Sequence, residues 1–408
     1  MSDATATGPT EVPDRTMGTY VRAEPLFVRG AGAWLVDDAG ERYLDLISGI
    51  GASSLGHGHA RLGARIAEQA AALGHVSNLY RHAPGEELSR RLTERCRMDA
   101  VFFSNSGSEA NETALKIARK VQVLRGQPER QSFVALTGGF HGRTTGALAV
   151  TAKESYREPF GALLDATFVD PENTAGLCAA LGAEPAALIL EPIQGEGGVR
   201  ELSTGFLQAA RAACDATGTV LIHDEVQCGS GRTGHFLAGD VYRARPDVVT
   251  LAKAAGAGVP FAATLARGEA ADALVPGDHG STYGGGTLAC QAALTVLDEL
   301  DAGLQERVVD LGDALNVGLD ALASAHPGPV LQRRGRGLIQ GLAMRRHDDA
   351  ARAVHALAHP AAGPPVLACT ASGGVLRLLP PYVLTDEDLA VALSQLDAAL
   401  VSLNRDQP

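Results

Sequence analysis

The cysteine spacing that a disulfide or zinc framework needs is absent from this sequence. Six cysteines are spread over 408 residues, and no two of them form a Cys-x-x-Cys pair. Disulfide scaffolds and structural zinc sites need closely and regularly spaced cysteines, so the pattern favours reduced thiols in a cytosolic protein. The cysteines are Cys96, Cys178, Cys214, Cys228, Cys290 and Cys369.

Basic runs, long apolar runs and targeting signals are also missing. The formal net charge is -12, from 35 basic and 47 acidic residues, which argues against binding to nucleic acid or to anionic membranes. No apolar run approaches the roughly 18 residues of a membrane span, so no span is expected. Residues 1–17 have neither an apolar core nor a positive leader, and we predict a disordered tail over 1–18 on a cytoplasmic protein.

The sequence does contain enough apolar residues for a large core. With 45% hydrophobic residues over 408 positions, two domains are expected. Short apolar segments alternate with helical ones, which predicts an α/β domain with a mostly parallel sheet. Predicted strands are 132–136, 187–190, 220–222, 248–251, 262–265 and, with a glycine-rich turn, 331–344; predicted helices include 205–216, 288–322 and one capped by Thr385 and Asp388.

Two charged residues fall at the carboxyl ends of such strands, where parallel sheets bind ligands. Lys253 follows the apolar stretch 246–251 and enters a loop of small residues. Partial burial there lowers the pKa of a lysine and makes its neutral amine available for a Schiff base. Asp224 ends the stretch 219–223, where a carboxylate can bond and protonate a pyridine nitrogen. Each residue alone also fits an ordinary surface lysine or turn former.

A phosphate site is predicted at the start of a helix. The segment 102–112 (Phe-Phe-Ser-Asn-Ser-Gly-Ser-Glu-Ala-Asn-Glu) predicts a short buried strand, a turn of small residues and a helix that runs to about Leu124. Backbone N–H groups at a helix N-terminus bind phosphate, and Gly107 and Ser108 allow the closest approach. A capped helix without a ligand is the alternative, because Ser and Asn are ordinary capping residues.

Longer motifs give the chain a family resemblance. They are Gly-Phe-His-Gly-Arg-Thr at 139–144, Glu-Pro-Ile-Gln-Gly-Glu-Gly-Gly at 191–198, Asp-Glu-Val-Gln-Cys-Gly-Ser-Gly-Arg-Thr-Gly at 224–234, Thr-Leu-Ala-Lys-Ala-Ala-Gly at 250–256 and Gly-Ser-Thr-Tyr-Gly-Gly at 280–285. From about Tyr20 to Leu389 the chain resembles the class III aminotransferases, which use pyridoxal 5'-phosphate, and most of all their acetylornithine and ornithine branch.

The resemblance implies fold type I of the pyridoxal phosphate enzymes and a homodimer with shared active sites. A large cofactor-binding domain would span 56–299. A smaller α/β domain would combine 19–55 with 300–408.

Residues that match the family's motifs acquire roles at the cofactor. Lys253 would carry the cofactor and, once displaced by substrate, shuttle a proton between the substrate carbon and the cofactor carbon. Asp224 would keep the ring nitrogen protonated, and Phe140 would stack on the exposed ring face. The other implied cofactor-binding residues are Gly107, Ser108, Glu225, Val226 behind the ring, Gln227 near the phenolic oxygen and, from the second subunit, Thr282.

The resemblance also implies substrate-binding residues. Arg143 and Arg377 each offer a planar fork that suits a carboxylate, and two such forks suit glutamate or 2-oxoglutarate. In the acetylornithine and ornithine branch, the residue matching Glu196 pairs with the one matching Arg377 while a diamine substrate is bound, and releases it for glutamate. Tyr20 matches a tyrosine at the substrate entrance, and Ser281 lies where a neighbouring subunit would touch the substrate.

Histidines near these motifs receive no catalytic or metal-binding role. His57 and His59 stand close together, but no acidic or thiol ligand has suitable spacing, so no metal site is predicted. His141 and His223 are expected to pack and form hydrogen bonds.

Departures from the family pattern leave the amine donor open. Gly286 and Thr287 replace the usual Asn-Pro, Cys228 replaces a Thr, Ala60 replaces a Pro, and Ala-Gly-Ala-Gly at 255–258 replaces Leu-Gly-Gly-Gly. These positions lie close to the cofactor or the subunit interface in the family. They would suit a relative recruited to a specialised pathway.

We therefore predict an aminotransferase that moves the terminal amino group of N-acetylornithine, or of a similar ω-amino acid, to 2-oxoglutarate, as in arginine biosynthesis. The products would be a semialdehyde and glutamate. Alternative donors are ornithine, 4-aminobutyrate or a specialised-pathway amine. An aminomutase or racemase on the same fold would need no second keto acid, and a cofactor-binding protein without turnover is the non-enzymatic alternative.

Overall fold

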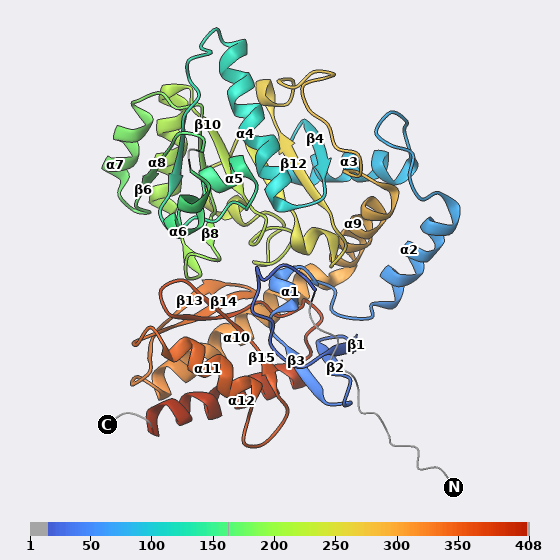
Figure 1. Cartoon of the computed structure of the whole chain (residues 1–408), viewed down its shortest axis with the longest axis vertical. Helices are drawn as coiled ribbons and strands as arrows, with labels where there is room; N and C mark the ends of the chain where they lie inside the picture. The colour runs from blue at the N-terminus through green and yellow to red at the C-terminus, as the bar shows by residue number, and fades with distance from the viewer. Residues whose placement is uncertain (1–14, 162, 406–408) are drawn as a thin grey trace.

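The centre of the computed structural model is a seven-stranded sheet in the order β4, β12, β11, β10, β7, β5, β6 (Figure 1). The structure describes residues 15–161 and 163–405. Neighbouring strands from β11 to β6 are parallel, whereas β12 runs antiparallel to both of its neighbours. The strands are β4 (Ala100–Ser104), β12 (Ala262–Ala266), β11 (Val248–Leu251), β10 (Val220–Asp224), β7 (Ala187–Leu190), β5 (Phe133–Leu136) and β6 (Ala166–Val169). The predicted mostly parallel sheet is confirmed.

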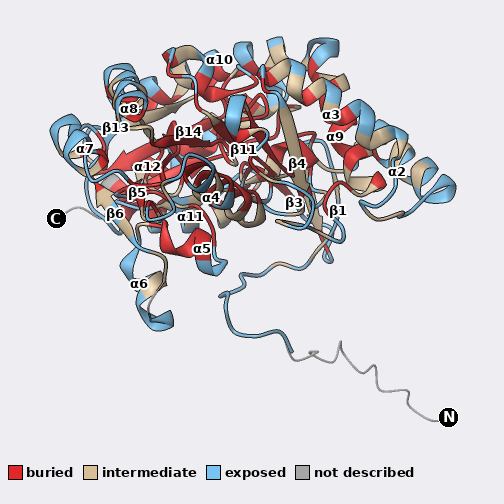
Figure 2. Ribbon diagram, turned by 90° about the horizontal axis from the view of Figure 1, so that it is seen from above, coloured by how far each residue is buried: buried red, intermediate tan, exposed pale blue. Residues whose placement is uncertain are grey.

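Helices cover both faces of this sheet because its strands are apolar on both sides. In β7, Ile189 packs with α4 on one face, while Leu188 and Leu190 pack with α7 and α8 on the other. Figure 2 shows the buried strands between helices whose outer surfaces are exposed. The helices of this part are α2 (Ala60–Ala72), α3 (Ala83–Cys96), α4 (Gly107–Leu124), α5 (Thr145–Ala149), α6 (Glu154–Arg157), α7 (Thr174–Leu181), α8 (Thr204–Thr217) and α9 (Thr287–Glu299).

The start of α4 is fixed by reciprocal capping bonds. Oγ of Ser106 accepts a hydrogen bond from the backbone N–H of Glu109 at 3.3 Å. The Glu109 carboxylate reaches back and accepts one from the backbone N–H of Asn105 at 2.8 Å. This capping box sets where the helix begins, and so turns Ala110 and Asn111 toward the sheet.

Segments from the two ends of the chain pack together below the large sheet (Figure 1). The late strand β15 pairs in parallel with the early strand β3, so both ends of the chain form one sheet in the order β1, β2, β3, β15. A further sheet has the order β13, β14, β17, β16. The bounds are β1 (Phe27–Ala31), β2 (Trp34–Asp37), β3 (Arg42–Asp45), β13 (Val330–Arg336), β14 (Ile339–Met344), β15 (Val366–Leu367), β16 (Cys369–Ala371), β17 (Val375–Leu378), α10 (Gln305–Ala325), α11 (Asp349–Ala358) and α12 (Asp386–Arg405). The predicted domain limits at 55/56 and 299/300 stay a prediction.

Short elements connect these layers. They are α1 (Ser48–Gly51), the strand pair β8 (Ile193–Gln194) and β9 (Arg200–Glu201), the 3-10 turns η1 (Glu158–Phe160), η2 (Ala238–Tyr242), η3 (Lys253–Gly256) and η4 (Gly268–Ala270), and the π-type turn η5 (Leu300–Leu304). Of these, η3 follows β11 directly and carries Lys253.

Some local predictions are corrected and others confirmed. The helical segment predicted over 288–322 is interrupted, because Gly303 has a φ of 110° in the π-type turn between α9 and α10. The strand predicted as buried at 102–103 is only half-buried. Thr385 and Asp388 do cap α12, with backbone-to-side-chain bonds of 3.2 and 3.1 Å.

The remaining sequence predictions concern the tail and the membrane. Residues 1–14 of the predicted tail lie outside the described residues. Over 15–161 and 163–405, none of the helices combines the length and the apolarity that crossing a membrane requires.

Candidate active site

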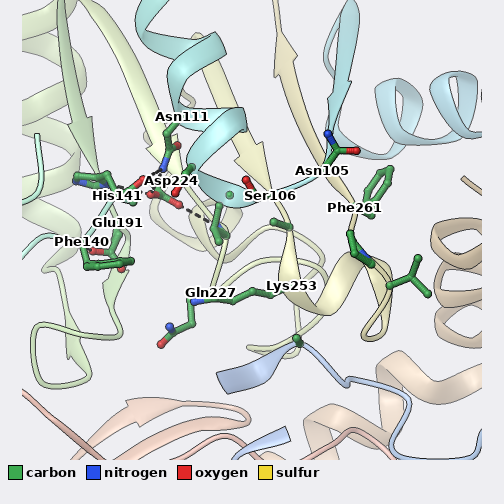
Figure 3. Close-up of a pocket in the computed structure, with 18 of the residues that line it drawn as sticks. Asn105, Ser106, Asn111, Phe140, His141, Glu191, Asp224, Gln227, Lys253 and Phe261 are labelled. Atoms are coloured by element: carbon green, nitrogen blue, oxygen red, sulfur yellow. Dashed lines mark hydrogen bonds and ion pairs between the residues drawn. The ribbon is translucent and has the colours of Figure 1, made fainter. Parts of the chain in front are cut away.

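A cavity of about 480 Å³ opens where β10 and β11 end and α4 begins. This is the edge at which parallel sheets bind ligands, and both Asp224 and Lys253 line it, as the sequence predicts. Figure 3 shows Lys253 extending from the loop after β11, with Asp224 beneath the start of α4. The cavity is lined by Ala52, Asn105, Ser106, Gly107, Ser108, Asn111, Phe140, His141, Gly142, Glu191, Asp224, Val226, Gln227, Ala252, Lys253, Gly258, Val259, Pro260 and Phe261.

The Asp224 carboxylate is held by three donors (Figure 3). Its Oδ2 accepts hydrogen bonds from Nδ2 of Asn111 at 2.7 Å and from Nδ1 of His141 at 2.8 Å. Its Oδ1 accepts one from the backbone N–H of Val226 at 3.0 Å. With the residue only 3% exposed, these bonds fix the orientation of the carboxylate. The site therefore presents a buried, rigidly held carboxyl group at the wall of the cavity.

Asn111 connects this carboxylate to the helix and to the next strand. Its Nδ2 also donates to the carbonyl of His141 at 2.7 Å, and its Oδ1 accepts from Oγ1 of Thr250 on β11 at 2.8 Å. The amide is fully used, so it cannot rotate without breaking a buried bond. Asn111 thus fixes Asp224 relative to both α4 and β11.

Lys253 occupies a strained position. It begins η3 with a φ of 47°, in the left-handed region that a non-glycine residue seldom adopts. Burial lowers the pKa of its amine, although the nearby carboxylate of Glu196 acts in the opposite direction. Within the described residues, Nζ has no hydrogen bond or ion pair. A lysine that is strained, desolvated and unpaired is available for covalent or proton-transfer chemistry.

The N-terminus of α4 forms the wall of the cavity that suits an anion. Gly107 lies against Val226, and a Cβ on it would stand 2.7 Å from a methyl group of that side chain. Oγ of Ser108 accepts from the backbone N–H of Arg143 at 3.1 Å. The N–H groups of the first turn and the helix dipole would favour an anion here, and phosphate binding by Gly107 and Ser108 stays a prediction.

Glu191 is a buried carboxylate that the sequence prediction left out. It accepts backbone hydrogen bonds from Phe140 at 2.8 Å and from Gly195 at 3.3 Å, and it lines the cavity. Burial raises its pKa to about 7, against the opposing charge of His141. By holding the backbone of Phe140, it places the aromatic ring that is predicted to face the cofactor.

An ion pair joins Glu196 to Arg377. Nη1 of Arg377 donates to Oε1 of Glu196 at 2.5 Å and to Oε1 of Gln227 at 3.2 Å. Arg377 is 2% exposed. Burial alone would raise the pKa of Glu196, but the charge and hydrogen bond of Arg377 outweigh it and lower that pKa. Gln227 fits beside this pair only because Gly195 has no side chain, since a Cβ there would lie 1.7 Å from its Oε1.

Other predicted site residues lie outside the cavity. The guanidinium of Arg143 stacks 3.5 Å above the ring centre of Tyr156. Tyr20 is 81% exposed. The Glu225 carboxylate points away from the cavity and accepts backbone bonds from Ala238 and Gly239 at 2.5 and 2.8 Å.

The loop around Ser281 and Thr282 lies beside the cavity. Oγ of Ser281 accepts a hydrogen bond from Nδ2 of Asn105 at 3.3 Å, whereas Thr282 is exposed. Asn78 also holds this loop, through the carbonyls of Ser281 and Gly284 at 2.8 and 3.0 Å. The loop is therefore fixed by its own subunit, with Thr282 directed to the surface.

The departures from the family pattern have structural accommodations. Oγ1 of Thr287 donates to the carbonyls of Leu73 and Gly74 at 2.8 and 2.7 Å and so ties the start of α9 to the segment after α2. Gly286 precedes α9 as its cap residue, and Ala60 is the first residue of α2. Cys228 is buried behind Asp224, where burial raises the pKa of its thiol.

Comparison with known proteins places this site in a family. The family model described as Aminotransferase class-III matches residues 19–400. The acetylornithine aminotransferase of Rhodobacter capsulatus is 42% identical over 388 residues, which cover 94% of this chain and 97% of that protein.

Solved structures agree over the same length. The ornithine aminotransferase of Toxoplasma gondii ME49 has a TM-score of 0.91 and 31% identity, with 96% of this chain and 94% of that one covered. The N-acetylornithine aminotransferase of Stenotrophomonas maltophilia K279a has a TM-score of 0.80 and 34% identity, with 94% and 97% covered.

Proposed function

Because the chain belongs to the class-III aminotransferases, we propose that it transfers the terminal amino group of N-acetylornithine, or of a similar ω-amino acid, to 2-oxoglutarate. The products are a semialdehyde and glutamate. Family membership confirms the predicted enzyme class and the predicted cofactor, pyridoxal 5'-phosphate.

The cavity has the groups that this cofactor requires. The N-terminus of α4, with Gly107 and Ser108, would hold its phosphate, and Asp224 would hold the proton on its ring nitrogen. Val226 and Phe140 would lie on either side of the ring. When bound, the cofactor carries the amino group and withdraws electrons from the substrate carbon.

The protein's own residues then act on the substrate. The amine of Lys253, whose pKa is lowered by burial, would take the proton from the reacting carbon and return it. The hydrogen bonds of Asn111 and His141 keep Asp224 in place while charge develops nearby. Glu191 would hold Phe140 against the cavity and thereby exclude water from that face.

One observation carries the choice of substrates, namely the pair between Glu196 and the buried Arg377. While the pair persists, Arg377 has no free charge for an α-carboxylate, so a donor would present its terminal amine. When Glu196 moves away, the guanidinium would bind a carboxylate of glutamate or 2-oxoglutarate. A site of this kind admits two substrates of different charge.

The active site is proposed to form in a cytoplasmic homodimer. Thr282 is exposed on a fixed loop, and apolar side chains around that loop, Leu79, Tyr80 and Tyr283, are 87%, 72% and 68% exposed. Such a patch favours an interface. Thr282 of the partner subunit would complete the phosphate site. The state is checked by light scattering over a range of protein concentrations.

A panel of amino donors tests the proposal. Each donor is incubated with 2-oxoglutarate and the loaded enzyme, and the glutamate formed is measured. We expect N-acetylornithine to give the highest kcat/KM, above ornithine, 4-aminobutyrate and α-alanine. Turnover of the amino donor without any keto acid, or a preference for α-alanine over the ω-amino donors, would overturn the proposal.

A further inference from the structure

The guanidinium of Arg377 is held by more than the ion pair. It has five N–H donors. Nη1 uses Glu196 and Gln227, and Nε donates to Sγ of Cys369 at 3.4 Å. Among the described residues, Nη2 has no hydrogen-bond partner. The Nη1 side of the guanidinium therefore faces its ion-pair partner Glu196, and the Nε side is covered by the sulfur of Cys369.

Cys369 is placed there by strand register. It lies directly opposite Arg377 in the antiparallel pair of β16 and β17. The same strand end also contacts the other member of the pair, because the backbone N–H of Ser372 donates to the carbonyl of Glu196 at 3.0 Å. Cys369 is half-buried and does not line the cofactor cavity. It can therefore act on Arg377 without touching the cofactor.

The position of the sulfur decides which edge of the guanidinium a carboxylate can use. A planar guanidinium binds a carboxylate through Nε and Nη2, or through Nη1 and Nη2. Cys369 takes Nε, so only the second edge remains. That edge is the one that Glu196 occupies. An incoming α-carboxylate must then displace Glu196, and the two states exclude each other.

We propose that Cys369 is a positioning residue that sets the affinity of Arg377 for the α-carboxylate of the glutamate and 2-oxoglutarate pair. This rests on the proposed function, in which Arg377 is released from Glu196 for the second half-reaction. Once Glu196 has left, Cys369 and Gln227 are the groups that keep the guanidinium in its plane. A thiol is a weak acceptor, so its effect is modest and confined to one substrate.

The test compares variants that differ only in the acceptor. Cys369→Val fills the space and suits a strand but has no acceptor, whereas Cys369→Ser keeps one. Cys369→Ala also removes the acceptor and replaces Cys369→Val in the test if valine does not fit the sheet. Cys178→Val is the matched control, because that cysteine is exposed on α7. Each loaded variant is mixed with glutamate or with N-acetylornithine, and single-turnover spectra give the apparent dissociation constant and the maximal rate.

We expect Cys369→Val to weaken glutamate binding about fivefold, as for one lost hydrogen bond, with the maximal rate and the constant for N-acetylornithine unchanged. Cys369→Ser restores most of the affinity. Calorimetric titration with glutarate, a dicarboxylate that cannot react, should show the same weakening. Equal losses with both substrates, or no loss in Cys369→Val, would overturn the inference. A wild-type enzyme that reacts with N-acetylornithine but not with glutamate would instead overturn the proposed function.

Discussion

Replacing Asp224 by Asn separates the chemical role of its charge from its structural role. The carboxylate accepts hydrogen bonds from Asn111, His141 and the backbone of Val226. An amide has one oxygen only. If that oxygen takes the place of Oδ2, the NH2 group faces the N–H of Val226; if it takes the place of Oδ1, the NH2 group faces two donors. At least one buried donor then loses its acceptor in Asp224→Asn.

The structural cost follows from that mispairing. A buried donor left without a partner costs about 1–3 kcal/mol, so the cofactor-free variant should lose that much unfolding free energy in urea. The catalytic cost should be larger, because in the proposed mechanism the ring nitrogen would lose the carboxylate that holds its proton. Removing one preorganised group of this kind lowers kcat by about 100-fold or more.

Asp45 supplies the matched control. It is also buried, and it accepts backbone bonds from Ile47 and Ser48 at 2.8 and 2.9 Å and has His57 Nε2 at 2.8 Å, but it does not line the cavity. In Asp45→Asn the amide oxygen can still accept both backbone bonds while the NH2 group faces His57, so this variant should lose no more unfolding free energy than Asp224→Asn and keep near-normal glutamate formation. Near-normal activity in Asp224→Asn, or equal losses of activity in the two variants, would contradict the proposed role of Asp224.

Two further predictions concern carboxylates with different roles. Glu196→Ala should free Arg377 for an α-carboxylate and shift selectivity toward glutamate by more than tenfold in single-turnover spectra. Breaking such a pair costs roughly 2–5 kcal/mol, and the low end applies because Glu196 is partly exposed. Equal changes with glutamate and N-acetylornithine would argue against a switch. Burial raises the pKa of Glu225 from its ordinary 4.5 to about 8, so the folded protein holds that proton to higher pH than the unfolded chain does. Its stabilising contribution is full below about pH 4.5 and is lost as the pH rises through about 8. In urea unfolding at a series of pH values, Glu225→Gln should therefore reduce the fall of the unfolding free energy with pH and leave cofactor affinity unchanged. Weaker cofactor binding in this variant would instead support the cofactor-binding role that the resemblance implies.

The sequence predicted that Asp224, Lys253 and Gly107 lie at one edge of the sheet because the signals for this are local. Apolar runs that end at Asp224 and before Lys253 identify strands of a parallel sheet, and such strands bring their carboxyl ends to one edge. Small residues before the helix likewise indicate where α4 begins, at Gly107 and Ser108. Each of these arguments needs only a strand or helix boundary.

Contacts between distant segments were not predictable in this way. Asn111 stands in the segment 102–112, yet its bonds to Asp224 and Thr250 depend on how α4 packs on the sheet. Hydrogen bonding by His141 was predicted, but its partner Asp224 was not. Phe261, an apolar residue that lines the cavity, lies in the loop before β12, and that loop carries no motif. A buried carboxylate such as Glu191 could have been suspected from its place directly after an apolar run.

The amine of Lys253 is the group proposed to hold the cofactor. Borohydride reduction of the loaded enzyme, followed by peptide mapping, tests it directly, and the other lysines in the chain are Lys116, Lys120 and Lys153. We expect a pyridoxyl group on the peptide that contains Lys253 and no labelling there in Lys253→Ala, which should also lose turnover. A pyridoxyl group on Lys116, Lys120 or Lys153 would contradict it.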